Sequence, residues 1–333
     1  MRRIVSSLLM GLWGLSFGAA HAGTPARLGT AGALELLIPT DARGVAMGGS
    51  VMAEGRGVQS LFWNPAGAAV LQGDEIAVSH RRYIADIGMS HLAYARETGA
   101  LGTLGLSAKV LSTDGDQVYT VDQPDGTGET FATSFVVVGL SLARTMTDRV
   151  SVGVNAHYVA EQIHRETAQG LAFDIGFVYR PTIAGLTLGV AIKNYGPKMR
   201  FDGPDFSVPS GDENPDAELR SRSASFELPS FIQFGLAWNG WSPAGQNVTF
   251  VGAFQANNFS EDEFRLGTEW ALADQLFLRG GYVASPLDGF QYGFSGGAGL
   301  RIPFGESVTS VDYAWVDAGV FESNHLFTVT LAF

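Results

Sequence analysis

The feature that most constrains the fold is a repeated alternation of apolar with small or polar residues along most of the chain. In 171–180, for example, Phe173 and Ile175 share one face, whereas Asp174 and Gly176 share the other. Side chains of a β-strand point alternately to opposite faces, so this period predicts strands with one apolar face. About fourteen segments of about ten residues are expected, each bounded by turn residues. They lie near 75–83, 89–97, 101–111, 131–144, 149–162, 171–180, 185–194, 228–239, 247–256, 263–272, 275–284, 290–302, 307–316 and 325–333.

The lengths of the connections separate a soluble β-sandwich from a transmembrane barrel. If both ends of the strand series are periplasmic, the two longest connections, 112–130 and 195–227, fall on the outer side. Short periplasmic turns and long outer loops are typical of outer-membrane barrels, whereas a sandwich has no such asymmetry. Aromatic residues near the periplasmic strand ends predict an interfacial ring of Tyr94, Tyr179, Trp238, Trp270 and Phe333. The sequence therefore predicts an all-β fold, a transmembrane antiparallel β-barrel of about 14 strands.

Charge and composition agree with a barrel and exclude other classes of partner. Only 16% of residues are charged, as expected of strands whose outer face meets lipid. A formal net charge of −12 repels nucleic acid, so no nucleic-acid partner is expected. The chain has no cysteine, which excludes disulfides and thiolate metal sites and fits an exported protein.

Residues 1–22 have the pattern of a cleaved signal peptide. Arg2 and Arg3 precede an apolar stretch, and Ala20-His21-Ala22 forms a small-x-small cleavage site. We therefore expect export and a final location in the bacterial outer membrane.

Residues 23–74 are apolar and rich in Gly and Ala, but they show no strand alternation. Asp41 is a good N-cap, and Asn64 followed by Pro65 predicts the start of a second short helix. We interpret this segment as a plug, or hatch, inside the lumen of a barrel formed by 75–333; the alternative is a subdomain packed outside a soluble sheet. The plug residues singled out are Arg43, Met47, Gly48, Gly49, Trp63, Asn64, Pro65, Ala66 and Gly67.

Strand alternation places several charged side chains in the lumen. They are Lys109, Asp174, Lys193, Arg265, Glu269, Arg279 and Asp312. Both signs are present, so these residues can pair with one another and with the plug. Arg43 has apolar neighbours in sequence, so we expect a bidentate pair with Asp174, Glu269 or Asp312; the alternative is contact with periplasmic water. His157 is expected to be a hydrogen-bonded lumen residue rather than a metal ligand.

No motif in the chain predicts catalysis, a cofactor or a metal site. HExxH, a P-loop and a nucleophile elbow are all missing from the sequence, so we expect a protein that is not an enzyme. The glycines at 293, 296, 297 and 299 are expected to let the plug approach the wall. The 112–130 loop is acidic through Asp114, Asp116, Asp122, Asp125 and Glu129. A solvated loop is favoured there over a divalent-cation site, because the spacing is not that of an EF-hand.

The last strand ends the chain on an aromatic residue. Phe327, Val329, Leu331 and Phe333 share one face. This pattern resembles the signal by which the barrel assembly machinery recognises outer-membrane barrels. The expected partners are this machinery together with outer-membrane lipid and lipopolysaccharide.

Several motifs resemble the PorV/PorQ family, which is related in fold to the FadL fatty acid channels. They are Gly29-Thr30-Ala31-Gly32, Ala42-Arg43, Ala46-Met47-Gly48-Gly49, Trp63-Asn64-Pro65-Ala66-Gly67, Leu278-Arg279-Gly280-Gly281-Tyr282 and Val311-Asp312-Tyr313-Ala314. The resemblance implies a fourteen-stranded barrel with a hatch and, for PorV, a role in type IX secretion.

We place first a PorV-like barrel that docks a secretion translocon or its cargo through the outer loops. The alternative is a FadL-like channel for uptake of a hydrophobic small-molecule ligand, and a structural or adhesive surface barrel is third. The candidate ligand contacts of the channel are Met47, Val51, Trp63 and Leu71.

Overall fold

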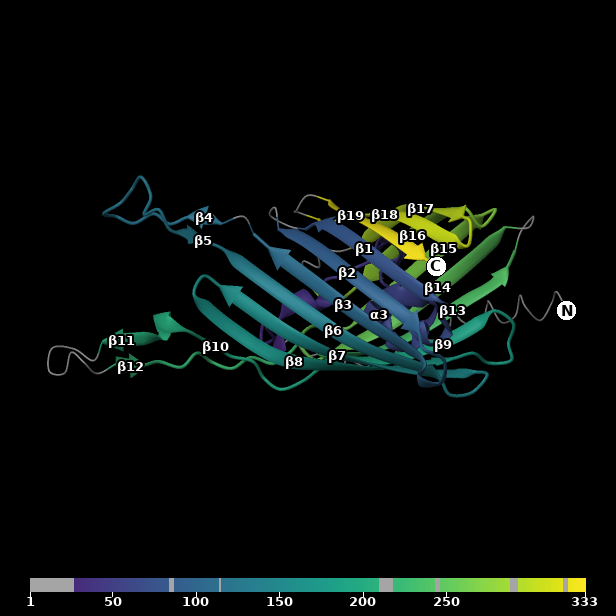
Figure 1. Cartoon of the computed structure of the whole chain (residues 1–333), viewed down its shortest axis with the longest axis horizontal. Coiled ribbons are helices and arrows are strands. Elements are labelled where there is room, and N and C mark those ends of the chain that lie inside the picture. The colour runs from purple at the N-terminus through teal and green to yellow at the C-terminus, as the bar shows by residue number, and fades with distance from the viewer. Residues whose placement is uncertain are drawn as a thin grey trace.

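The computed structural model describes residues 27–83, 87–113, 115–209, 218–242, 246–287, 293–319 and 323–333, so the predicted signal peptide lies outside the described residues. One large antiparallel sheet dominates the fold and contains fourteen long strands (Figure 1). These strands are β1 (Asp74–Arg82), β2 (Gly88–Glu97), β3 (Thr103–Ser112), β6 (Thr133–Thr145), β7 (Val150–Ile163), β8 (Glu166–Tyr179), β9 (Leu186–Tyr195), β13 (Phe231–Trp241), β14 (Asn247–Asn257), β15 (Glu263–Leu272), β16 (Leu276–Ala284), β17 (Phe294–Phe304), β18 (Ser307–Val316) and β19 (Asn324–Ala332).

The sheet closes on itself. Each long strand pairs with its neighbours in chain order, and β19 returns to pair with β1, from Glu75 opposite Ala332 to Arg82 opposite His325. The predicted transmembrane-type barrel of about 14 strands is therefore confirmed. β8 begins at Glu166, earlier than predicted, because its polar first residues carry no hydropathy alternation and still pair with β7.

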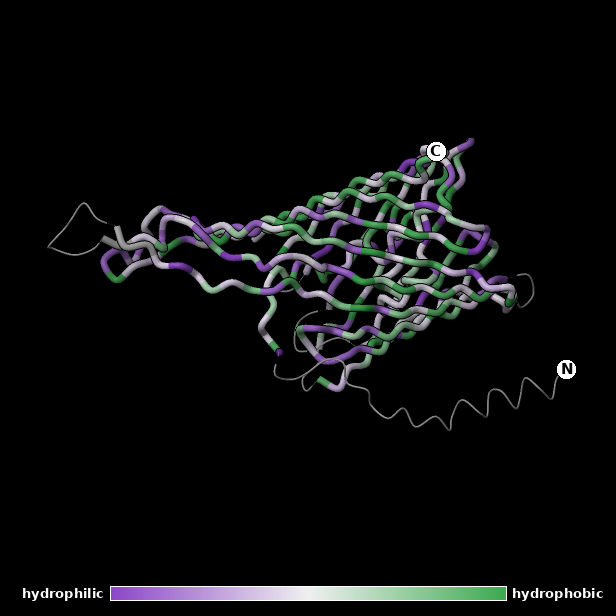
Figure 2. The backbone as a smooth tube through the Cα atoms, turned by 90° about the horizontal axis from the view of Figure 1, so that it is seen from below, coloured by the Kyte–Doolittle hydropathy of each residue, from purple (hydrophilic) through white to green (hydrophobic). Residues whose placement is uncertain are grey.

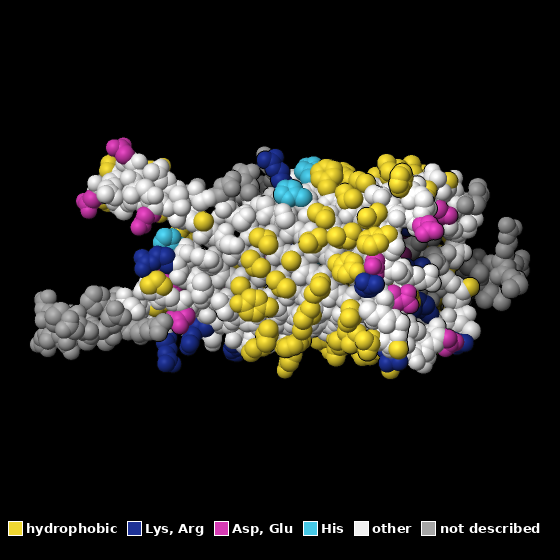
Figure 3. All heavy atoms as spheres, viewed as in Figure 1, with side chains coloured by type: hydrophobic (Ala, Val, Ile, Leu, Met, Phe, Trp, Pro, Cys, Tyr) yellow, Lys and Arg dark blue, Asp and Glu magenta, His cyan; other side chains and the backbone are white. Residues whose placement is uncertain are grey.

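The outer surface of the barrel is apolar and the lumen side is small or polar. On β8, Phe173, Ile175 and Phe177 are 42–45% exposed, whereas Asp174 and Gly176 point inward and are buried. Figure 2 shows this alternation along the strands, and Figure 3 shows the hydrophobic side chains spread over the outer wall. A soluble sheet would cover such residues, so this surface is the one that faces lipid. Among the described residues, no helix has the length and apolar character needed to cross a membrane.

The segment before β1 lies inside the lumen. It consists of the short turns η3 (Leu34–Leu37), α2 (Ala42–Ala46), η4 (Val51–Ala53), η5 (Gly57–Gln59), α3 (Ser60–Trp63) and η6 (Pro65–Val70). α2 contacts β16 to β19, η4 contacts β9, β13 and β14, η5 contacts β1 and β2, and η6 contacts β3 and β6 to β8. Because these strands surround the segment on all sides, its turns fill the bore of the barrel. We call residues 27–73 the N-terminal segment.

Glycines in the wall allow this segment to approach closely. A Cβ atom added to Gly176 would lie 2.0 Å from Oδ1 of Asn64, and one added to Gly281 would lie 2.1 Å from the Gly48 nitrogen. Any larger residue at either position would displace the segment. The capping geometry expected at Asn64 is present, because its side chain accepts a hydrogen bond from the Ala66 amide.

The glycines at 293, 296, 297 and 299 were predicted to let the N-terminal segment approach the wall, but most of them do not contact it. Only Gly297 meets the N-terminal segment, with its added Cβ 2.7 Å from an alanine methyl group of α2. Gly299 instead gives room to the Arg279 guanidinium, and Gly293 and Gly296 meet no atom of the segment. The prediction is therefore wrong for three of these four glycines, because the register between the segment and the wall decides which glycines it contacts.

Both long connections project beyond the same end of the barrel, opposite the C-terminus (Figures 1 and 2). They carry two small ribbons and two further short elements: β4 (Asp116–Gln117) with β5 (Thr130–Phe131), β11 (Ser207–Pro209) with β12 (Glu218–Arg220), β10 (Phe201–Asp202) and η9 (Pro204–Phe206). A single 3-10 turn, η8 (Gly99–Leu101), lies in the short connection at the other end. Since long loops are outer in such barrels, we refer to the ribbon end as the outer end.

Candidate functional site

The candidate site is a cavity of about 430 Å³ in the outer half of the lumen. The N-terminal segment supplies its apolar side through Leu28, Leu34 and Ile38, together with Phe62 and Trp63 at its base. Leu34 is 54% exposed although it lies within the barrel, so its side chain faces this open space. The volume is in the range of about 300–1,000 Å³ typical of small-molecule sites. The wall and floor can therefore hold an apolar ligand.

Polar groups are confined to a few places on the wall of this cavity. They come from the outer parts of the strands and include Arg81, Lys193, Gln233, Gln255, Glu263 and Arg265. Arg265 donates to the Gly48 carbonyl at 3.3 Å and also pairs with Glu263, so its charge is already compensated. A mostly apolar lining with few fixed polar groups is the usual composition of a ligand pocket.

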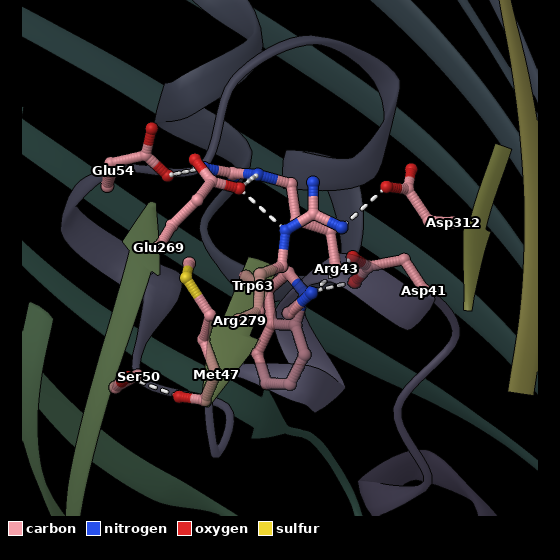
Figure 4. A network of polar contacts seen from close by, with 10 residues as sticks. Asp41, Arg43, Met47, Ser50, Glu54, Trp63, Glu269, Arg279 and Asp312 are labelled. Atoms are coloured by element: carbon pink, nitrogen blue, oxygen red, sulfur yellow. Dashed lines mark hydrogen bonds and ion pairs between the residues drawn. The ribbon is translucent and has the colours of Figure 1, made fainter. Parts of the chain in front are cut away.

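An ion-pair cluster fixes the N-terminal segment to the wall below the cavity (Figure 4). Arg43 of α2 donates from Nε and Nη2 to the two carboxylate oxygens of Glu269 on β15, at 2.9 Å each. Nη2 of Arg43 also lies 2.6 Å from Glu54 within the same segment. Arg279 of β16 donates to Glu269 at 2.6 Å and to Asp312 of β18 at 2.6 Å. Bidentate and charge-assisted contacts of this kind are geometrically specific, so the cluster sets the position of α2.

Asp41 joins this cluster to the floor of the cavity. Its Oδ1 accepts the Gly44 amide at 2.7 Å as the N-cap of α2, and its Oδ2 accepts the indole N–H of Trp63. Burial raises the pKa of Asp41 above its ordinary value, while these hydrogen bonds oppose that effect. The cap therefore holds the Trp63 ring in place at the base of the cavity.

A second polar cluster centres on Asp174 of β8. Its carboxylate accepts hydrogen bonds from the Asn155 amide at 2.9 Å and the Asn194 backbone at 2.8 Å, and it is bonded to Nε2 of His157 at 3.0 Å. Lys193 lies 3.9 Å away and donates to the carbonyl of Phe62. The buried carboxylate is thus fully surrounded by donors, which is the condition for a stable charge away from water.

Phe62 separates the large cavity from a smaller one. Its ring lies 4.2 Å from Nζ of Lys193 and 5.3 Å from Nζ of Lys109, so it is held by two cation–π contacts. The smaller cavity, of about 30 Å³, lies against His91, His157 and Lys109. Leu36, Phe62 and Lys193 line both cavities, so these three side chains lie between them.

Glu35 adds an unexpected acidic group to the N-terminal segment. It is 5% exposed and faces Glu161 of β7, while Nζ of Lys109 donates to its backbone carbonyl at 2.6 Å. Burial, together with the charge of Glu161, raises the pKa of Glu35 to about 8. Burial beside a second carboxylate thus favours the neutral form of Glu35.

The structure brings several of the predicted lumen charges together and distributes them over two clusters. Glu269, Arg279 and Asp312 form one with Arg43, and Asp174 and Lys193 form the other. Lys109 binds the carbonyls of Glu35 and Ile38, and Arg265 binds that of Gly48. Asn155 and Glu161, which share the predicted lumen face of His157, are both buried on the inner side of β7. Sequence reasoning missed Glu35 and Glu54, whose only signal in the sequence is their apolar neighbourhood.

Of the candidate ligand contacts, only Trp63 lines the large cavity. Met47 and Val51 pack with Trp63 in the apolar core, and Leu71 packs with the alanines near the opposite end of the barrel. Asp114 lies outside the described residues, and no group of three or more His, Asp or Glu within the described ranges could hold a metal ion.

Three residues of the predicted assembly signal lie on the last strand, β19, and Phe333 directly follows it. Phe327 and Val329 are exposed on its outward face, and the backbone N–H and C=O of Phe333 bond to Asp74. Leu331 is half-buried on the same face. The chain end thus completes the closure of the barrel against β1.

The sequence matches a family model over residues 16–238, which is more than half of the chain. The chain belongs to the uncharacterised protein family UPF0164. Membership in UPF0164 assigns no activity, and the resemblance to PorV/PorQ stays a prediction. No functionally curated protein matches the chain in sequence.

Solved structures of outer-membrane channels share the fold. The chain is similar to the CymD monoaromatic hydrocarbon channel, with a TM-score of 0.55, 13% identity, and 89% of this chain and 98% of that chain covered. It is similar to the Pseudomonas putida toluene transporter TodX, with a TM-score of 0.51, 12% identity and coverage of 87% and 96%. A Pseudomonas aeruginosa FadL homologue gives a TM-score of 0.50, 13% identity and coverage of 89% and 98%. This UPF0164 chain therefore has a FadL-like barrel fold, of the kind found in outer-membrane proteins.

Proposed function

We propose that the protein is an outer-membrane channel that takes up small hydrophobic molecules. The observation that carries the proposal is the apolar cavity of about 430 Å³ at the outer end of the lumen, into which Leu34 projects. In a soluble or purely structural barrel, the apolar side chains of the bore are expected to be packed rather than exposed to an open cavity. The names of the structural relatives, a hydrocarbon channel and a toluene transporter, support this proposal.

In this proposal a ligand enters at the outer end and meets the N-terminal segment as the barrier to the periplasm. Phe62 and Trp63 form the base of the cavity, and the ion pairs of Arg43 keep the segment in the bore. Passage requires only displacement of packed side chains or of the segment itself. The channel thus acts without catalysis, cofactor or metal. Export through a signal peptide and insertion by the barrel assembly machinery are parts of the same proposal.

The experiment is a binding and uptake measurement with labelled toluene and labelled dodecane on the full chain in proteoliposomes. We expect saturable uptake above that of empty liposomes. Leu34→Asn places a polar group in the cavity and should weaken binding about tenfold. Val121→Asn, at a loop position that is 99% exposed, is the matched control and should leave binding unchanged. Uptake no greater than in empty liposomes, or equal loss in both variants, contradicts the proposal.

A second candidate function is docking of a secretion translocon or cargo, as in PorV. It is favoured by the two ribbons that extend beyond the outer end, one of which exposes Tyr119 and Val121. Deletion of 115–131 should then abolish co-purification of a large partner from native membranes and leave toluene uptake intact. If toluene uptake is lost and no partner is found, the channel is the better description.

A further inference from the structure

A group of basic side chains lies on the lipid-facing side of the wall, at the outer end of β1 and β19. His80 and Arg82 of β1 and His325 of β19 are all exposed and point outward. In Figure 3, His side chains and a Lys or Arg side chain gather at this end of the apolar surface. Such a cluster is unusual in a chain with a formal charge of −12 and a largely apolar outer wall.

Strand register places the three basic groups next to one another. Arg82 is directly opposite His325, and His80 lies two residues before Arg82 on the same face. Directly opposite side chains are about 4.5–5.5 Å apart at Cβ, and diagonal neighbours about 7–8 Å apart. All three side chains can therefore contact one anion of the size of a phosphate group.

Neighbouring residues orient the two imidazole rings. Nδ1 of His325 is hydrogen-bonded to the Tyr313 hydroxyl at 2.8 Å, and the two rings are stacked. Nδ1 of His80 is bonded to the Ser90 hydroxyl at 3.2 Å. In each ring this occupies Nδ1 and leaves Nε2 for an external partner.

No salt bridge to Arg82 occurs within the part of the chain that the structure describes. Asp317, which follows on the outward face of β18, accepts a hydrogen bond from the Gly319 amide. A guanidinium is well suited to bind phosphate, because its planar set of donors matches two phosphate oxygens.

The position of the cluster along the barrel points to a lipid headgroup. On the same strands and the same face, Val78, Phe327 and Val329 follow towards the membrane interior and are 46–54% exposed. Trp315 lies opposite His325 at the level of the cluster, as aromatic residues do at membrane interfaces. The basic groups thus lie where the apolar wall ends on the outer side, at the level of the headgroups.

We propose that His80, Arg82 and His325 bind a phosphate group of an outer-leaflet glycolipid whose acyl chains lie along β1 and β19. The site is separate from the lumen cavity and does not depend on the channel function. Charge complementarity supplies the affinity for phosphate, and the apolar face below supplies contact for the acyl chains.

The test is native mass spectrometry of the delipidated full chain in detergent, titrated with diphosphorylated lipid A. We compare the wild type with the triple variant His80→Gln, Arg82→Gln and His325→Gln. The control is Arg144→Gln, which removes an outward-facing arginine near the end of β6 that is far from the outer ribbons. We expect affinity to fall by on the order of tenfold or more in the triple variant and to be unchanged in the control.

Two further binding measurements identify which part of the lipid is recognised. Fully dephosphorylated lipid A should bind the wild type about as weakly as lipid A binds the triple variant. Inorganic phosphate at the same concentration should not compete. Equal binding of lipid A to wild type and triple variant, equal binding of the dephosphorylated lipid, or competition by inorganic phosphate would each overturn the proposal. If the triple variant does not fold, as judged by its heat-modifiable migration on gels, Arg82→Gln alone replaces it and should show the same direction of change.

Discussion

Arg43 of the N-terminal segment and Glu269 of β15 form a bidentate ion pair, with both N–O distances at 2.9 Å. Glu269 also accepts a hydrogen bond from Arg279, so one wall carboxylate binds two guanidinium groups. The pair lies within the bore, where the guanidinium is shielded from solvent and a lost partner is not replaced by bulk water. The pair therefore ties α2 to the wall at β15.

The substitution Arg43→Met should loosen the N-terminal segment without opening the barrel. It leaves Glu54 without its cation and removes one of the two cations from Glu269. Breaking a buried pair from one side costs about 3–5 kcal/mol. We expect hydrogen exchange in residues 41–55 to become at least tenfold faster, while exchange in the strands stays slow.

Arg96→Met is the control for this substitution. Arg96 is paired with Asp74 at 3.5 Å, but its side chain is 63% exposed. Exposed pairs contribute about 0–1 kcal/mol, so the exchange of residues 41–55 should not change. Unchanged exchange in Arg43→Met as well would mean that packing, and not the ion pair, holds the segment.

The strands could be predicted from the sequence because a barrel wall imposes one rule on every residue. Outward positions meet lipid and inward positions meet the lumen, so hydropathy alternates wherever a strand crosses the membrane. The rule ends where β8 extends beyond the lipid, and Glu166–Gly170 were missed for that reason. The position of Asn64 at a helix cap could also be predicted, because it depends only on local backbone chemistry.

The site could be predicted only in part. The sequence suggested a carboxylate partner for Arg43, but the choice among Asp174, Glu269 and Asp312 depends on barrel register and on how the segment enters the bore. The cavity was missed because residues 28–39 line it only after the segment folds into the bore, and their sequence shows no periodicity. Glu35 was missed for the same reason.

The substitution Gly176→Val should displace the turn that contains Asn64. The added side chain would occupy the position of Oδ1 of Asn64, which lies 2.0 Å from an ideal Cβ. Overpacking of this kind costs about 1–3 kcal/mol. We expect protease cleavage within residues 55–70 to become faster. Gly280→Val is the control, because Gly280 faces outward and its added Cβ meets no atom within 4 Å; if it has the same effect, the loss comes from the strand and not from the turn.

Docking of the Glu35 region should weaken as the pH rises. The pKa of Glu35 is raised to about 8 from 4.5 by burial and by Glu161, so the docked segment holds a proton that a released segment gives up. Stability is therefore highest below 4.5, falls as the pH rises to about 8, and changes little above that. Protection factors of residues 34–38, measured from pH 5 to pH 9, should follow this course in the wild type and depend less steeply on pH in Glu35→Gln. A slope in Glu35→Gln equal to that of the wild type would assign the dependence to another group.

The substitution Phe62→Ala should join the two cavities and raise the rate of passage through the bore. The ring lies between the large outer cavity and the small one beside His91 and His157, and it lines both together with Leu36 and Lys193. Its removal deletes the largest of these apolar side chains. The two lysines lose their cation–π contacts with the ring but keep their hydrogen bonds to backbone carbonyls. We expect labelled toluene to enter proteoliposomes several-fold faster, with its affinity for the outer cavity reduced.

Phe131→Ala, in the exposed β5 strand outside the barrel, is the matched control and should behave as the wild type. Equal uptake by Phe62→Ala and wild type would show that the barrier lies deeper in the N-terminal segment, at the Arg43 cluster.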